Sequence, residues 1–520
     1  MSVLTLDYLL RRALRRHRDR VALACGARHV TYGDLDRSSN RLANALIGQG
    51  AKAGDRIATV LSNSVEFIEA ELATIKAGMV KSPINPRLSP REIIRILSNI
   101  RATGVFLDEQ YQEAVLDARS GLPNLKFVVV VGSTKPGAMQ ISELIKSSSE
   151  SEIPSPTHVD DLGLMRFSGG TTGEPKGIMH SAGSLASIAL SVVREYNLSS
   201  EDCFLSVAHL SHGQNFVWPA LFCVGARLVL MDKFEPESVL RTIATQGITR
   251  LHMVPTMWSA VIDHPRFSEY DVSSLRNIVY ASAPMPVDRI RKLIGIFGRR
   301  VTQVYTLSES AVVTTLLRPE DHVIDGPDYA VRRLASCGRE ALDVSVQIVD
   351  DERRPLPVHE IGELAISSPG NMMGYWEMPE LTQQVLRGDW VVTGDLGYMD
   401  EEGFVFLVDR KDDKIITGAL NVYPREVEEV VYSHPAVREC AVIGIPDEKW
   451  GEAIIAFVTL RPGVSCEAED LLRHCEGRIA DYKKPRSIVF LDDLPKSSVG
   501  KIARRTLREP YWKGYERFVN

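Results

Sequence analysis

Short apolar runs alternate with longer segments of helical periodicity along most of the chain. The runs predict β-strands at residues 57–61, 127–131, 227–231, 277–281 and 301–305. Behind the cap candidates Asn63 and Ser64, apolar residues recur at the three- and four-residue steps of a helix face that should pack on a sheet, namely Val65, Ile68, Leu72, Ile75 and Met79. Alternating strands and helices predict an α/β fold.

The apolar runs become shorter toward the C-terminal third of the sequence. Shorter apolar runs predict a small sheet or β-barrel at 344–349, 363–367 and 404–408. The charged run 409–414 then precedes a compact set of strand and helix patterns, which is typical of a joint between domains, although a solvated turn has the same composition. We therefore predict a large N-terminal domain of α/β layers over residues 1–409, whose β-barrel subdomain begins at about residue 335, and a small α+β C-terminal domain over 410–520.

Charge and cysteine content narrow the function classes. The 520 residues carry a formal net charge of -6, which gives no electrostatic footprint for nucleic acid or an anionic membrane. No apolar run reaches the ~18 residues of a membrane span, and the start lacks the apolar core of a secretory signal. Seven cysteines show no C-x-x-C pair and no histidine at zinc spacing, so we expect free thiols, no metal cage and a cytoplasmic protein.

The N-terminal segment is basic between residues 11 and 20. That composition suggests a transit peptide as one reading. Helical spacing favours instead an amphipathic surface helix that belongs to the fold, because of Tyr8, Leu9, Leu10 and Leu14.

One run concentrates groups that bind phosphate. A predicted strand at 162–167 leads into Ser168-Gly169-Gly170-Thr171-Thr172-Gly173-Glu174-Pro175-Lys176-Gly177. Glycines leave backbone N–H groups accessible, hydroxyls add donors and Lys176 adds a cation. A Walker A loop requires G-x-x-x-x-G-K-[ST], which this run lacks. The run therefore predicts a nucleotide-polyphosphate loop of another kind, with a surface hairpin as the plain alternative.

Further motifs follow one another in an order that resembles the acyl-adenylate-forming superfamily of acyl-CoA synthetases, adenylation domains and luciferases. Besides the phosphate loop they are Thr31-Tyr32-Gly33-Asp34-Leu35, Asn85-Pro86-Arg87-Leu88-Ser89, Tyr305-Thr306-Leu307-Ser308-Glu309, Gly374-Tyr375-Trp376, Thr393-Gly394-Asp395, Asp409-Arg410-Lys411-Asp412 and Pro495-Lys496-Ser497-Ser498-Val499-Gly500-Lys501. The resemblance implies a ligase that uses ATP and Mg²⁺ to convert a carboxylic acid to acyl-AMP, releasing pyrophosphate, and then transfers the acyl group to a thiol.

The resemblance also assigns roles around the nucleotide. Lys501 corresponds to the lysine that reaches between carboxylate and α-phosphate, and Glu309 to the acidic residue that holds Mg²⁺. Tyr305 would lie against adenine, and Asp395 would bind the ribose hydroxyls together with Arg410. Further contacts are implied for Ser168, Gly169, Gly170, Thr171 (also a metal ligand), Thr172, Gly173, Lys176, Ser282, Ala283, Thr306 and Ser308.

Two thiol acceptors stay open. In the family the C-terminal domain rotates between the two half-reactions, and Asp412 falls at the hinge. Coenzyme A would be recognised by cations and aromatic rings, for which Arg87, Trp450, Tyr482, Lys484 and Arg486 are candidates. The family's Gly-Gly-Glu is here Gly418-Ala419-Leu420, before Asn421. These residues should narrow the tunnel through which, in the family, the thiol reaches the acyl-adenylate. A phosphopantetheinyl carrier protein is therefore the alternative acceptor.

The acyl pocket is expected behind His212, which corresponds to the gating residue. Gly213 stands where amino-acid activators carry an aspartate for the substrate ammonium, so a non-amino acid is favoured, because a buried unpaired cation is costly. An aromatic, alicyclic or medium-chain acyl group would face the candidates Asn215, Phe216, Trp218, Met253, Met257, Ser282 and Met285, although such residues are often plain core. A nucleotide sensor without catalysis is disfavoured by the intact Lys176, Glu309, Asp395 and Lys501. Monomer and homodimer stay open.

Overall fold

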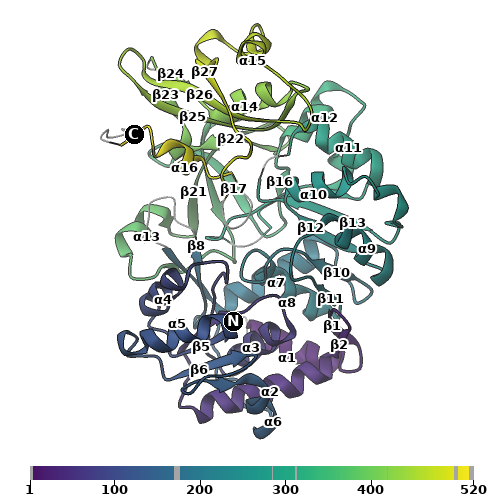
Figure 1. The fold of residues 1–520 in the computed structure, drawn as a ribbon, viewed down its shortest axis with the longest axis vertical. Helices are drawn as coiled ribbons and strands as arrows, with labels where there is room; N and C mark the ends of the chain where they lie inside the picture. The colour runs from purple at the N-terminus through teal and green to yellow at the C-terminus, as the bar shows by residue number, and fades with distance from the viewer. Residues whose placement is uncertain are drawn as a thin grey trace.

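The computed structural model describes residues 4–168, 176–283, 285–310, 313–418, 420–496 and 502–513. Figure 1 shows the N-terminal elements at the lower end of the molecule and the C-terminal elements at the upper end, with residues 200–350 between them. Two large sheets form the N-terminal part, and a smaller unit follows residue 410. The structure confirms the predicted α/β fold with a large N-terminal and a smaller C-terminal domain.

The first large sheet has a parallel centre. Within the described residues its order is β16 (Arg339–Glu340), β15 (Thr315–Leu317), β14 (Val301–Tyr305), β13 (Asn277–Ala281), β12 (Arg250–Met253), β10 (Cys203–Ser206), β11 (Arg227–Leu230), β1 (Val21–Cys25) and β2 (Arg28–Thr31). The strands from β14 to β1 pair in parallel, and the strands at the two ends pair antiparallel. The carboxyl ends of these central strands therefore share one edge of the sheet.

The second large sheet is also mostly parallel. Its order is β19 (Gly374–Tyr375), β9 (Lys176–Ser181), β8 (Leu162–Ser168), β4 (Val80–Pro83), β3 (Arg56–Val60), β5 (Gly104–Asp108), β6 (Phe127–Val131) and β7 (Met139–Gln140). Among the described strands of this sheet, the antiparallel pairs are β9 with β8 and β9 with β19. The helices of the N-terminal part are α1 (Leu6–Arg16), α2 (Tyr32–Gly48), α3 (Val65–Lys76), α4 (Pro90–Asn99), α5 (Gln112–Asp117), α6 (Ile141–Ser147), α7 (Ala182–Glu195), α8 (Gln214–Val224), α9 (Pro236–Gln246), α10 (Pro255–Ile262), α11 (Val287–Phe297) and α12 (Asp328–Arg332).

The β-rich region after residue 344 forms a third sheet. It contains β17 (Ser345–Val349), β18 (Gly362–Ser367), β20 (Leu386–Arg387), β21 (Trp390–Met399) and β22 (Val405–Arg410), with α13 (Pro379–Val385) beside it. In the described residues β17 and β22 do not pair with each other, so this subdomain is a sheet with two edges and not the barrel that was also expected.

The C-terminal unit has a sheet and a core of its own. The sheet contains β23 (Ile415–Thr417), β24 (Leu420–Val422), β25 (Val437–Asp447), β26 (Gly451–Leu460) and β27 (Ser487–Phe490). The helices are α14 (Pro424–Tyr432), α15 (Ala468–Cys475) and α16 (Arg504–Arg508). Its buried residues form clusters separate from those of the N-terminal part, as expected of a unit that folds around its own core.

Helix α3 is more deeply buried than its periodicity predicted. Ser64 caps it by accepting the Phe67 N–H at 3.1 Å, as the sequence suggested. The predicted apolar face is buried, and polar residues outside it, including Glu71 and Lys76, are buried as well. Their charges therefore require partners inside the protein.

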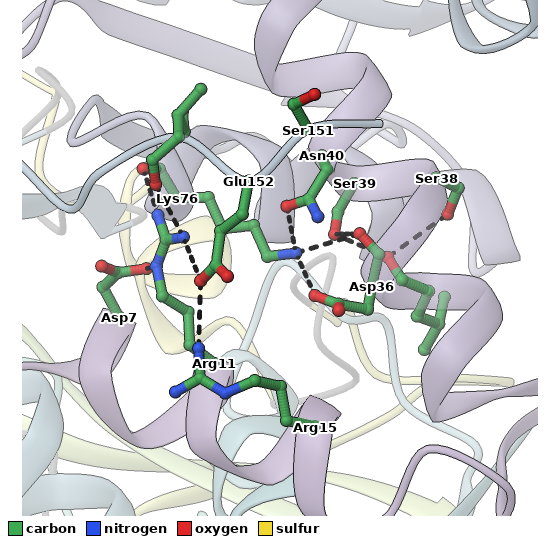
Figure 2. A network of polar contacts seen from close by, with 12 residues as sticks. Asp7, Arg11, Arg15, Asp36, Ser38, Ser39, Asn40, Lys76, Ser151 and Glu152 are labelled. Carbon is green, nitrogen blue, oxygen red and sulfur yellow. Dashed lines mark hydrogen bonds and ion pairs between the residues drawn. The ribbon is translucent and has the colours of Figure 1, made fainter. Parts of the chain in front are cut away.

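Helix α2 pairs the charge of Lys76, and the N-terminal helix α1 contacts its backbone (Figure 2). Arg11 lies between Asp7, at 2.7 Å, and the carbonyl of Lys76, at 2.8 Å. The Lys76 ammonium donates to Asp36 at 2.6 Å and to Asn40 at 2.7 Å. Leu9, Leu10 and Leu14 are buried as predicted, whereas Tyr8 is exposed. The opposite face, with Arg12, Arg15 and Arg16, is exposed, so α1 is an amphipathic surface helix that belongs to the fold, as predicted. Among the described residues, none of the helices is long and apolar enough to span a bilayer.

Candidate active site

The carboxyl ends of four parallel strands bring most of the predicted site residues together. After β10 comes the loop with His212, β12 ends at Met253, β13 is followed by Ser282, and β14 by Thr306–Glu309. Parallel sheets bind ligands at this edge, because the loops that follow the strands converge there. Sequence distance between these residues is large, and the sheet order alone makes them neighbours.

The predicted phosphate loop joins the antiparallel strands β8 and β9, where Ser168 pairs with Lys176. Some predictions fall on positions that the structure does not describe: Gly169, Gly170, Thr171, Thr172, Gly173 and Lys501, together with the side chains of Ser168 and Asp412. Lys176 is described at the far end of the loop, where its ammonium lies 5.7 Å from the centre of the Tyr375 ring.

Tyr375 connects this lysine to the predicted metal ligand. Its hydroxyl donates to Glu309 Oε1 at 2.9 Å. The Glu309 carbonyl accepts the Met372 N–H at 2.7 Å, which ties the two segments together. Strand β19 pairs with β9 through Tyr375 and Ile178, so the Gly-Tyr-Trp motif places the phenol by extending the sheet. Burial, followed by the nearby Glu309 charge, raises the pKa of Tyr375, so the phenol stays a hydrogen-bond donor.

Asp395 is held by two partners. Tyr305 donates its hydroxyl to Asp395 Oδ2 at 2.5 Å, and Arg410 Nε lies 2.7 Å from Asp395 Oδ1. The pair 395 and 410 faces across β21 and β22. Each carboxylate oxygen keeps a free lone pair in this arrangement. Asp395 can therefore accept hydroxyl protons from a ligand while its position stays fixed.

The remaining nucleotide predictions line the same edge. Ser282 is exposed and has a φ of 71°, a left-handed conformation that is uncommon outside glycine and is enriched at functional sites. Ala283 is partly buried and Thr306 is exposed. The Ser308 carbonyl accepts a hydrogen bond from the His180 ring at 2.9 Å.

The acyl side begins at the loop before α8. His212 and His209 lie with ring centres 6.2 Å apart. Burial, together with smaller effects of nearby arginines, lowers the pKa of His212 to about 3 and that of His209 to about 4. Both rings are therefore neutral at physiological pH. Each has a buried Nε2 without a hydrogen-bond partner among the described residues. Nothing lies within 4 Å of a Cβ built on Gly213, so open space adjoins this pair.

The predicted pocket residues divide into two groups. Phe216 is buried with its ring 5.8 Å from that of His180; Met253 and Met285 are buried and Met257 is partly buried near the same sheet edge. Asn215 and Trp218 were expected beside them. Asn215 is instead locked by Lys81 at 2.6 Å and Glu71 at 3.1 Å, and Trp218 is only 1% exposed and packs on Phe222. The first hydrogen-bonds only protein groups and the second packs in the core.

The acceptor candidates lie on both domains. Arg87 is exposed in the N-terminal part, near enough to His209 and His212 to lower the pKa of both. In the C-terminal unit the Arg486 guanidinium lies 4.9 Å from the Trp450 ring centre, and the Gly418 N–H donates to the Trp450 carbonyl at 2.8 Å. Tyr482 is exposed, Lys484 pairs with Asp481 at 2.7 Å, and Asn421 is exposed on β24. Two of these candidates, Trp450 and Arg486, form one surface.

The predicted hinge is a short turn. Strand β22 ends at Arg410, residues Lys411–Asp413 form one turn of 3₁₀ helix, and β23 begins at Ile415. Asp413 is held by Arg508 at 2.6 Å and by Arg504 at 3.7 Å. The turn therefore joins the third sheet to the C-terminal unit and contacts the last helix of that unit.

Three residues of the site lacked a predicted role. Tyr375 lies in a motif that the sequence revealed, but its partner Glu309 is 66 positions away in the chain. His209 precedes the predicted gate by three residues. Arg166 lies in the strand that enters the phosphate loop, where residue type alone suggests a surface position. No spacing signal in the sequence indicates that any of the three faces the cleft.

Comparison with known proteins decides the family. The model of the AMP-binding enzyme family matches residues 10–376, and the model of the AMP-binding enzyme C-terminal domain matches residues 426–501. The chain belongs to the AMP-binding enzymes. It is an adenylate-forming enzyme of the acid–thiol ligase type by family and by its relatives, which are acyl-CoA and aryl-CoA ligases.

Relatives with different acids share most of this chain. A medium/long-chain-fatty-acid–CoA ligase of Mycobacterium tuberculosis, FadD8, is 31% identical over 98% of this chain and 91% of its own. A feruloyl-CoA synthase of an Amycolatopsis species is 32% identical over 94% and 96%. A fatty acid–[acyl-carrier-protein] ligase of Streptomyces coeruleorubidus, ScoC, is 31% identical over 96% and 95%. The crystal structure of the anthranilate CoA ligase AuaEII with anthranoyl-AMP superposes with a TM-score of 0.90 at 28% identity, covering 98% of each chain.

Proposed function

We propose that this AMP-binding enzyme joins a non-amino carboxylic acid to the thiol of coenzyme A by way of an acyl-adenylate. The observation that carries the proposal is the position of Asp395 and Glu309. Tyr305 and Arg410 hold Asp395, and Tyr375 holds Glu309. Glu309 lies near enough to Arg410 to raise its pKa, and Lys176, at the end of the phosphate loop, lies 5.7 Å from the centre of the Tyr375 ring.

The proposed reaction has two steps. A carboxylate oxygen of the acid attacks the α-phosphorus of ATP, a phosphorus–oxygen bond breaks, and pyrophosphate leaves. The thiol sulfur then attacks the acyl carbonyl, its proton is lost, and AMP leaves. Asp395 would orient the ribose, Lys176 would neutralise phosphate charge, and Lys501, by family resemblance, would reach the reacting oxygens.

The residues of this cleft fit a magnesium ion. Glu309 offers a carboxylate whose Oε2 has no partner among the described residues, and Mg²⁺ favours one or two carboxylates with phosphate oxygens and water. The ion would neutralise charge on the departing pyrophosphate. Tyr375 would hold Glu309 in one orientation by hydrogen bonding Oε1.

The charges of the acyl side favour acids without an amino group. Arg166 lies near enough to His212 to lower its pKa, and Gly213 supplies no carboxylate. An ammonium group in this pocket would meet a cation and would lack an anion to pair with it. Relatives that act on feruloyl and fatty-acid groups agree with such a pocket.

Coenzyme A is proposed as the acceptor because Trp450 and Arg486 form a stacked aromatic and cationic surface beside Gly418, which suits an adenine ring and phosphate charge. A carrier protein is the second candidate, since ScoC is a relative over most of the chain. We assign residues 1–409 and 410–520 as the two domains and Asp412 as the hinge about which they alternate.

A cytoplasmic location is part of the same proposal. All seven cysteines are free, and four of them, Cys203, Cys337, Cys440 and Cys475, are buried. Free thiols are maintained in a reducing compartment.

A carboxylic-acid panel tests the function. ATP–pyrophosphate exchange should appear with at least one aromatic, alicyclic or medium-chain acid and be absent with their α-amino counterparts. The active acid is then incubated with either coenzyme A or a phosphopantetheinylated carrier protein, and AMP release is measured. Turnover with the carrier alone would select the second candidate. Exchange with no acid would refute the function.

A further inference from the structure

Two cations on the acyl side, the buried Lys81 and the partly buried Arg166, differ in their partners. Lys81, on β4, lies 3.0 Å from Glu71 and donates to Asn215 at 2.6 Å. Asn215 donates in turn to Glu71 at 3.1 Å. Lys81 is therefore paired and hydrogen-bonded, as buried charges normally are. Removing one member of such a pair leaves the other charge buried without compensation and destabilises the fold.

Arg166, on β8, has no comparable partner. Its guanidinium makes no hydrogen bond or ion pair with any residue that the structure describes, and the guanidinium carbon lies 5.2 Å from the centre of the Phe216 ring. Burial lowers the pKa of Arg166 to about 10, yet the residue is only partly buried. The guanidinium thus lies deep in the protein but remains accessible to solvent.

None of the described groups near Arg166 hydrogen-bonds or forms an ion pair with it. His180 uses its Nε2 on the Ser308 carbonyl at 2.9 Å, and burial lowers the pKa of this ring to about 4. His212 is neutral, as described above. Glu309 is near enough to raise the pKa of Arg166 but accepts its hydrogen bond from Tyr375.

Two predicted pocket residues lie near this cation: the Phe216 ring, at 5.2 Å, and His212, whose pKa Arg166 lowers. An acyl group that fills the pocket would exclude solvent from Arg166. Guanidinium N–H groups that lose water without gaining an acceptor incur a penalty, and sites of this kind discriminate strongly against ligands that lack the matching group.

We propose that Arg166 is a specificity-determining residue, which hydrogen-bonds an oxygen acceptor on the acyl part of the acid substrate. This inference rests on the proposed function and narrows it. The preferred substrates are acids with a second oxygen-bearing group, most strongly a second carboxylate and next a hydroxyl or carbonyl, within reach of Phe216 and His212. An anionic group there would form a bidentate pair with the guanidinium.

Matched acids test the proposal. Hexanoate, 6-hydroxyhexanoate and adipate share one chain, and benzoate, 3-hydroxybenzoate and isophthalate share one ring. We expect the wild-type kcat/KM in acid-dependent exchange to be at least about tenfold higher for the oxygen-bearing members of one series. Arg166→Met should remove that preference by lowering kcat/KM for those members, while the parent acid stays within about threefold. Arg166→Lys should retain part of the preference, because it keeps the positive charge but lacks the two parallel N–H donors of a guanidinium.

Stability and binding provide separate readouts. Arg166→Met should keep or raise the melting temperature, because it removes an unpaired buried charge, whereas the control Lys81→Met should lower it. Titration of the acids without ATP should show the same preference as exchange does.

Three results would overturn the proposal: equal loss for every acid, an unchanged preference in Arg166→Met, or a lower melting temperature of that variant. If the wild type shows no exchange with any acid while the titration still shows an Arg166-dependent preference, the proposed function fails and the assignment of Arg166 stands.

Discussion

The nucleotide side and the acyl side of the site differ in whether their polar side chains already have partners in the protein. On the nucleotide side, Asp395 and Glu309 already have partners in Tyr305, Arg410 and Tyr375. On the acyl side, the described part of the chain leaves Arg166 without a hydrogen bond and both His209 and His212 with a buried, unpartnered Nε2. Under the proposed function, the groups that act on every acid are held in place before a substrate binds, whereas the groups proposed to select the acid lack partners in the described part of the protein.

This division has an energetic basis. Preorganised groups stabilise charge in the transition state without reorganising at the moment of reaction. Unsatisfied polar groups destabilise the empty pocket and are compensated only by a matching ligand. We expect substitutions on the nucleotide side to affect all acids alike and substitutions on the acyl side to affect them unequally.

The largest effect is expected from Lys501→Ala. By family resemblance this lysine serves only the adenylation step, so exchange should fall by at least about a hundredfold, while thioester formation from supplied acyl-adenylate should persist. Each half-reaction is measured separately. The control is Lys496→Ala, whose ammonium pairs with Glu439 at 3.0 Å in the same segment. Equal loss of both steps would contradict the assignment.

Asp395→Ala tests the uniformity of the nucleotide side. Removing the carboxylate also releases Tyr305 and Arg410, so exchange should fall by roughly two decades or more, by the same factor for every acid. Asp351→Ala is the matched control, because its exposed carboxylate pairs with Lys411 at 2.9 Å outside the cleft. A loss that varied from acid to acid would contradict the expectation that the nucleotide side serves every acid alike.

Tyr375→Phe should have a smaller effect. It removes the hydroxyl that orients Glu309, and a hydrogen bond to a charged group corresponds to about tenfold in rate or affinity. We expect a higher magnesium concentration for half-maximal exchange, measured by magnesium titration. Tyr398→Phe, whose ring stacks on Phe406 at 4.9 Å, should behave as the wild type does. An unchanged magnesium dependence in Tyr375→Phe would show that the phenol has no role in holding Glu309.

The smallest effect is expected in stability at low pH. Burial holds the pKa of His212 at about 3, against about 6.5 in the unfolded chain. The unfolded state therefore takes up the proton first, so the contribution of this ring is complete above about pH 6.5 and is lost as the pH falls toward 3. Chemical denaturation should show His212→Gln losing about 2 kcal/mol less than the wild type between about pH 6.5 and 4.5. Identical pH dependence would contradict a buried neutral ring.

Sequence reasoning reached the fold class and many of the strands, because five-residue apolar runs such as Phe127–Val131 report burial directly. It identified Glu309, Asp395 and Arg410 as candidate site residues because they lie in motifs that follow one another in the order typical of the family. It failed where tertiary packing overrides periodicity: α3 is buried on faces that its pattern marked as polar, and Asn215 hydrogen-bonds Lys81 across 134 positions. The partners of such side chains depend on sheet order, which local sequence patterns do not encode.

The most direct test of this account is nucleotide binding without acid. Calorimetric titration with a non-hydrolysable ATP analogue and magnesium should give the same affinity for the wild type and for Arg166→Met, while Asp395→Ala should bind at least about tenfold more weakly. Binding of the analogue only after an acid is added, or equal weakening by the Arg166 and Asp395 substitutions, would contradict a nucleotide side that is assembled in advance.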